Sequence, residues 1–154
     1  MEPLSVEEAM EVLDSQPVAH LGVIHDGLPY VTPMSYVVAG DRILFRTMAG
    51  KKLDALRSNP EVCIEVSTYD PDSGDWSSVI VRGTASEVED DDTKTATITR
   101  LFDKYDQVLG SPISGGGGLR PVLGLPRVIA VSIDEISGVT SGRGFSIRTK
   151  PGRL

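Results

Sequence analysis

A β-hairpin is predicted by the stretch Val18-Ala19-His20-Leu21-Gly22-Val23-Ile24-His25-Asp26-Gly27-Leu28-Pro29-Tyr30-Val31-Thr32-Pro33-Met34-Ser35-Tyr36. Two extended apolar runs, 18–24 and 30–38, flank His25-Asp26-Gly27, which is typical of a tight turn between antiparallel strands. The chain therefore contains at least one pair of neighbouring strands that are hydrogen-bonded to each other.

Pro33 stands in the middle of the second run and cannot donate a hydrogen bond to a neighbouring strand. We expect this strand at the edge of a sheet, at a bulge, or locally released from pairing. A proline that protects an edge against aggregation is the simplest interpretation. A released strand would instead offer backbone N–H and C=O groups to a flat heterocycle, and the strand by itself leaves both interpretations open.

Further extended runs lie on the C-terminal side of this hairpin, and helical patterns are inserted among them. Ser5 and Glu8 form a capping box before an apolar helical stripe, a short helical pattern follows Gly50, and Asp90-Asp91-Asp92 places acid at the start of a third helix. The strands follow one another mostly in hairpin order and do not alternate with helices. The fold is therefore predicted to be mainly β, a six-stranded antiparallel β-barrel with inserted helices. The four additional strands are expected at 42–47, 62–66, 76–88 and 127–136.

The totals are those of one soluble domain spanning 1–154, with a hydrophobic share of 40% and a charged share of 24%. The segment 110–126 contains Gly115-Gly116-Gly117-Gly118 and is expected to be a mobile loop, and 138–154 is expected to be a basic C-terminal tail.

The net charge of −7 argues against nucleic-acid binding. No apolar run is long enough to span a membrane, and the N-terminus does not resemble a signal peptide. The single cysteine, Cys63, fits a reducing cytoplasm.

Lys51 and Lys52 follow Gly50 at the start of the short helical pattern. The first turn of a helix carries partial positive charge and unpaired N–H groups, so cations are disfavoured there unless an anion binds. Phosphate is the usual anion at such a position. A solvated pair of surface lysines is the alternative.

No spacing of histidine and cysteine suggests a metal site, and His20 and His25 are the only histidines. His20 is expected to be a packed residue more often than a flavin or haem contact.

Three segments together resemble the FMN-binding split barrels of the pyridoxamine-phosphate-oxidase-like family, and most closely their nitroimidazole-reductase-like branch. The segments are Gly27-Leu28-Pro29-Tyr30-Val31-Thr32-Pro33-Met34-Ser35-Tyr36, Ile43-Leu44-Phe45-Arg46-Thr47, and Gly50-Lys51-Lys52-Leu53-Asp54-Ala55-Leu56-Arg57-Ser58-Asn59-Pro60-Glu61-Val62-Cys63-Ile64-Glu65-Val66. Trp76-Ser77-Ser78-Val79-Ile80-Val81-Arg82-Gly83-Thr84-Ala85 continues the match, which covers about residues 5–105. The resemblance implies a Greek-key split β-barrel that forms a homodimer with two FMN molecules at the subunit interface.

The resemblance also implies a set of FMN contacts in this sequence. One group would lie along the isoalloxazine ring, a second would border the ribityl chain and phosphate, the lysine pair would bind the phosphate, and the remaining residues would approach from the other side or close the site. In that order these are Thr32, Pro33, Met34 and Ser35; Arg46 and Thr47; Lys51 and Lys52; Ser78 and Val79; and Arg143, with Phe145 as its alternative.

The function implied is that of an FMN-dependent oxidoreductase that passes a hydride or electrons to a small molecule such as a nitroaromatic or quinone. The tail lacks the substrate-binding arginine pattern of true pyridoxamine-phosphate oxidases, which argues against the namesake vitamin reaction. The alternatives are a flavin- or haem-binding module without turnover and a deazaflavin-dependent reductase on the same barrel. The residues do not identify a catalytic group, an electron donor or a substrate.

Overall fold

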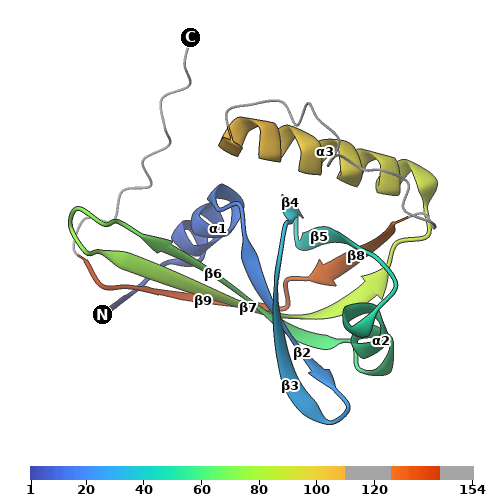
Figure 1. Ribbon diagram of the computed structural model, residues 1–154. Coiled ribbons are helices and arrows are strands. Elements are labelled where there is room, and N and C mark those ends of the chain that lie inside the picture. The colour runs from blue at the N-terminus through green and yellow to red at the C-terminus, as the bar shows by residue number, and fades with distance from the viewer. Residues whose placement is uncertain (110–125, 143–154) are drawn as a thin grey trace.

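The computed structural model describes residues 1–109 and 126–142, and it describes side chains for 1–106 and 126–142. Antiparallel strands form a curved sheet, and three helices lie on its flanks and ends (Figure 1). The strands are β1 (Glu2–Pro3), β2 (Ala19–His25), β3 (Leu28–Met34), β4 (Val37–Ala39), β5 (Arg42–Thr47), β6 (Glu61–Tyr69), β7 (Trp76–Glu87), β8 (Arg127–Ser132) and β9 (Glu135–Thr140). The helices are α1 (Val6–Ser15), α2 (Lys51–Ser58) and α3 (Asp91–Leu109).

The sheet runs in the order β3-β2-β6-β7-β8-β5-β4, with β9 paired to β7 and β1 paired to β9. β3 and β4 are the two ends of this path, and no pairing joins them although they are consecutive in the chain. The barrel is therefore split between β3 and the β4–β5 pair. The predicted class, a mainly β antiparallel split barrel, is confirmed.

The strand count was wrong: the described residues form nine strands, where six were predicted. The run expected over 30–38 is interrupted at Ser35 and Tyr36, which lets β4 leave β3 and pair with β5. The run expected over 127–136 divides into β8 and β9 because β7 pairs with both: 85–87 with β8 and 77–82 with β9. Residues 138–140 therefore belong to β9 and not to a tail, while most of the expected tail and the expected loop lie outside the described residues.

The local signals in the sequence were confirmed. Asp26 and Gly27 both have positive φ, 51° and 75°, as a two-residue hairpin turn between β2 and β3 requires. Ser5 and Glu8 form the reciprocal capping box of α1. Asp90 accepts hydrogen bonds from the backbone and hydroxyl of Thr93 at the start of α3, and these bonds lower the pKa of its carboxyl group.

The main core lies inside the barrel, where α1 contributes Ala9, Val12 and Leu13. A second apolar cluster forms where α3 packs against the outer side of β4, β5 and β8; its buried members are Val37, Leu44, Leu101, Val128 and Ala130. None of the described helices is long and apolar enough to cross a membrane. The short helix α2 follows β5 and lies against β2, with Leu53, Ala55 and Leu56 buried in the main core (Figure 1).

Candidate functional site

The first turn of α2 carries two positive charges at the split in the barrel. Gly50 precedes the helix and has no side chain to cap it, so no side-chain hydrogen bond satisfies the first N–H groups of α2. Lys51 and Lys52 are the first two helical residues. This arrangement confirms the predicted position of both lysines at a helix start, where an anion is favoured.

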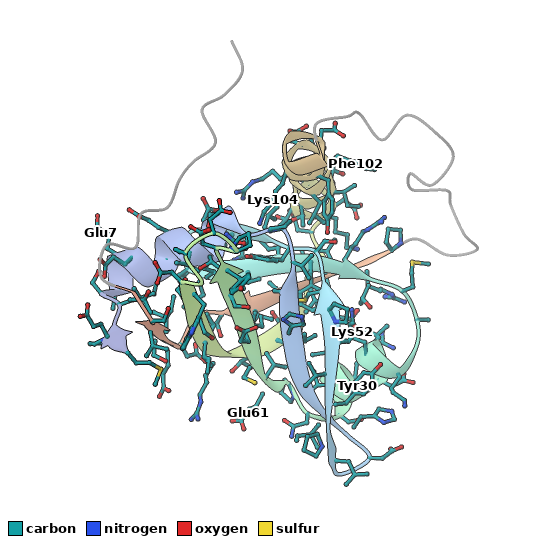
Figure 2. All side chains as sticks on the ribbon, turned by 60° about the vertical axis from the view of Figure 1, so that its left-hand side comes forward. Glu7, Tyr30, Lys52, Glu61, Phe102 and Lys104 are labelled. Carbon is teal, nitrogen blue, oxygen red and sulfur yellow. The ribbon has the colours of Figure 1, made fainter. Side chains whose placement is uncertain are left out.

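Each lysine lies over an aromatic ring from a different strand. The Nζ of Lys51 is 5.1 Å from the ring centroid of Tyr30 on β3, and the Nζ of Lys52 is 5.8 Å from that of Phe45 on β5. Figure 2 shows Lys52 and Tyr30 on the same side of the molecule. The two ammonium groups therefore bridge the strands on either side of the split, with aromatic faces that favour cations beneath them.

No carboxylate neutralises this pair within residues 1–109 and 126–142, where neither Lys51 nor Lys52 forms an ion pair. Partial burial lowers the pKa of the Lys52 ammonium group, because desolvation disfavours its charged form. A bound anion would offset that penalty. The charge pattern of the described residues thus suits an anionic ligand better than a cation or a neutral group.

The predicted contacts on β3 do not all face the same way. Thr32 is half-buried on the same face of β3 as Met34, whose side chain is buried in the core, and Pro33 is exposed on the opposite face. Pro33 lies on an edge strand, since β3 pairs only with β2 among the described strands, which confirms one of the three arrangements expected for it. The hydroxyl of Ser35 accepts a hydrogen bond from the hydroxyl of Tyr105 on α3, so the Ser35 side chain is turned toward that helix.

Arg46 and Thr47 lie on opposite faces of β5. The Arg46 side chain is exposed, whereas Thr47 is buried, with its hydroxyl directed at the backbone oxygen of Met48 at 3.3 Å. Thr47 is on the same face as Phe45, since alternate residues of a strand share a face. Of these two predicted contacts, Thr47 is the one that accompanies the aromatic ring beneath Lys52.

The side chains of Ser78 and Val79 also face opposite sides of their strand, β7. Val79 is fully buried in the barrel core, so its side chain packs against other core residues and is not part of the surface. Ser78 faces outward and donates a hydrogen bond of 2.9 Å to Glu65 Oε1 on β6. The other oxygen of Glu65 is 3.1 Å from Nδ1 of His20 on β2. Three neighbouring strands thus present a connected polar set, Ser78–Glu65–His20, on the outer face of the sheet.

A groove of about 520 Å³ runs over this outer face near the turn of the β2–β3 hairpin. Its lining includes the exposed side chains of Ile24 and Val31, together with Cys63 and Arg82. Tyr30 is also among the lining residues, but its side chain is on the opposite face of β3 from that of Val31, packed against the core and under Lys51. The structure therefore places a cationic helix start on one face of β3 and, on its other face, a partly apolar depression of the size that small-molecule sites have.

Several of these features were not assigned from the sequence. Tyr30 and Phe45 belong to quoted segments, but only the structure shows that they lie under the lysines. Glu65 gave no local signal, because it becomes a partner of His20 and Ser78 through strand register. Arg143 and its alternative Phe145 lie outside the described residues.

Comparison with known proteins identifies a family whose profile covers the whole barrel. Residues 5–140 match the sequence profile of the family described as pyridoxamine 5'-phosphate oxidase. An uncharacterized protein of Rhizobium meliloti, RA0666, is 33% identical over 85 residues, which are 55% of this chain and 56% of that protein. The chain thus spans a little over half the length of that curated relative.

Solved structures share the fold at low identity. An FAD-binding protein from Mesorhizobium loti is 24% identical, with a TM-score of 0.73 over 92% of this chain and 97% of that one. A candidate 5-nitroimidazole antibiotic resistance protein from Bacteroides thetaiotaomicron is 19% identical, with a TM-score of 0.68 over 89% of this chain and 86% of that one. At these identities the likeness shows a common fold.

Proposed function

Because this chain belongs to the pyridoxamine 5'-phosphate oxidase family, we propose that it is an FMN-binding oxidoreductase acting on a small molecule such as a nitroaromatic or quinone. The observation that carries the proposal is the pair Lys51 and Lys52 at an uncapped helix start, each over an aromatic ring and without an ion pair among the described residues. Solved relatives are described as flavin-binding proteins, which supports the cofactor class.

The described residues fit a flavin that ends in a phosphate. Two ammonium groups without counter-ions and free N–H groups at the start of α2 suit a dianion. Thr32 and Pro33, on the open edge strand, would lie along the ring system, and Thr47 would border the chain that leads to the phosphate. Bound flavin would supply the capacity to accept and release a hydride or single electrons.

The cofactor is expected between two copies of this chain. The outer face that carries the groove exposes large apolar side chains, among them Val31 and Ile80, and such faces mark interaction sites. A second copy packed on this face would bring Ser78, held by Glu65, to the cofactor of its partner. His20, whose Nδ1 contacts the same carboxylate, would lie beside Ser78 on this face.

The Lys51→Ala/Lys52→Ala double variant tests the phosphate site. Each charge-assisted contact is worth about 1.5–3 kcal/mol, so loss of both lowers FMN affinity by about two to four decades. The variant is expected to purify folded but colourless, whereas the parent protein shows the visible absorption of bound flavin. The mass of the molecule released by heat identifies it as FMN, FAD or a deazaflavin.

The matched control is Lys94→Ala, which removes a lysine of α3 that pairs with Asp91 at 3.9 Å, away from the site. It should keep its flavin and its colour. Full flavin occupancy in the double variant would overturn the phosphate assignment. Reduction of the bound flavin by NADPH or NADH, followed by its reoxidation by a nitroaromatic or quinone, would establish turnover and exclude a binding module without activity.

A further inference from the structure

A second cavity, of about 330 Å³, lies apart from the groove and the lysine pair. It is bounded by the end of α1, by β4 and by α3, and its lining consists of Asp14, Val37, Val38, Arg100, Asp103 and Lys104. Figure 2 shows Lys104 beside α3, well away from Tyr30. The volume is at the lower end of the range for small-molecule sites and suits a ligand of a few heavy atoms.

Lys104 is the lining residue with a primary amine. Its Nζ donates a hydrogen bond of 3.0 Å to the backbone oxygen of Tyr36 and lies 3.8 Å from the centroid of the Tyr36 ring. No carboxylate forms an ion pair with Lys104 in the described part of the chain. The amine is therefore held in place by a carbonyl and a ring, neither of which takes its proton.

Burial lowers the pKa of the Lys104 ammonium group to about 8. Charged groups from both adjoining helices modify this effect: Asp14 of α1 raises the pKa and Arg100 of α3 lowers it. Asp103 also lines the cavity. Near neutral pH an appreciable fraction of the amine is uncharged, and the uncharged amine is the nucleophilic form.

The charges of the lining argue for an uncharged ligand. Asp14 and Asp103 oppose the cations Arg100 and Lys104, so the cavity has no excess of positive charge to attract an anion. In addition, Arg100 Nη2 donates a hydrogen bond of 2.6 Å to the backbone oxygen of Val38. Val37 and Val38 supply the apolar part of the wall.

We propose that this cavity binds a small uncharged aldehyde or ketone and that the Nζ of Lys104 condenses with its carbonyl carbon. The amine nitrogen forms a bond to the carbonyl carbon, and the carbonyl oxygen leaves as water with the two amine protons, so that an imine results. No electrons are transferred, and the step needs neither an oxidant nor a reductant. It is independent of flavin binding, because none of its residues belongs to the groove or to the lysine pair.

Propanal with sodium cyanoborohydride, which reduces an imine to a stable amine, tests the proposal on the full chain. Peptide mapping should show Lys104 labelled at least about tenfold faster than Lys94 at pH 8, since an ordinary lysine is almost fully protonated there. The Lys104 rate should rise with pH to a plateau with a midpoint near 8. It should also saturate with propanal concentration, as binding in a cavity requires.

Two variants separate cavity binding from amine reactivity. Lys104→Arg keeps a cation that can donate to the Tyr36 oxygen but lacks the nucleophile, and should lose the fast adduct. Val38→Phe fills part of the cavity and should slow labelling of Lys104 while leaving the pH midpoint in place. Equal rates at Lys104 and Lys94, or a Lys104 rate that stays linear in propanal and is unchanged by Val38→Phe, would overturn the proposal.

Discussion

A hydrogen atom is all that fits on the Cα of Gly83, because a Cβ there would lie 1.7 Å from the backbone oxygen of Ser132. Gly83 lies on β7 between the section that pairs with β9 and the section that pairs with β8. At this residue the backbones of β7 and β8 approach so closely that no side chain can be placed between them. Gly83 therefore permits the close approach of β7 and β8 at the point where β7 changes from one partner strand to the other.

Gly83→Ala is expected to lower the free energy of unfolding by about 3 kcal/mol or more, since backbone atoms must move to admit the new methyl group. Urea denaturation of the purified variant measures the loss. Gly22→Ala is the matched control, because its Cβ would meet the Sγ of Cys63 at 2.9 Å, the end of a side chain that can rotate. We expect it to lose less than about 1.5 kcal/mol. Equal losses in the two variants would contradict this account.

The cationic face of α3 protects the open edge of β4. Arg100 and Lys104, one helical turn apart, donate to the backbone oxygens of Val38 and Tyr36, and Tyr105 is bonded to Ser35. These carbonyl groups lie at the end of the sheet, where no further strand pairs with β4 among the described residues. Side chains of a helix thus take the place of a neighbouring strand and protect the edge from pairing with another chain.

The contact of Lys104 makes stability depend on pH. Its pKa falls from an ordinary value of 10.5 to about 8 on folding, so between these values the unfolded chain binds more protons and the free energy of unfolding rises with pH. Burial of Tyr36 raises the pKa of its hydroxyl group, which has the opposite effect above pH 10. Urea denaturation at pH 7.5 and 9.5 should show a gain of about 1 kcal/mol, reduced from full linkage because Lys104 is partly exposed.

Lys104→Met removes the titrating group and should abolish this gain between pH 7.5 and 9.5. Lys94→Met, on the same helix, should retain it. A gain that persists unchanged in Lys104→Met would show that another group is responsible.

At the scale of the whole molecule, the outer face of the sheet should be the surface through which two copies associate. Ile80 is 45% exposed on this face although it is a large apolar residue on a central strand. Association would bury it and would bring Ser78, Glu65 and His20 to the cofactor of the second copy. A protein that needs both copies to complete its site should lose flavin when it becomes monomeric.

Ile80→Asp places a charge in this face and should shift the protein from dimer to monomer in sedimentation velocity, with a parallel loss of bound flavin. Val6→Asp, at a residue 64% exposed on α1, is the control and should leave both properties unchanged. A parent protein that is monomeric and fully loaded with flavin would refute the shared site.

The amino-acid sequence alone was enough to predict the turn at Asp26 and Gly27, the capping box at Ser5, the acidic start of the third helix, and the position of two lysines at a helix start. Each of these depends on hydrogen bonds or charges within about four residues, so local chemistry determines it. The pairing of β7 with two strands, the burial of Val79, and the position of Tyr30 beneath Lys51 were seen only in the folded chain. These three features depend on which distant segments of the chain come into contact. The packing of the whole barrel determines those contacts, so no local pattern in the sequence reveals them.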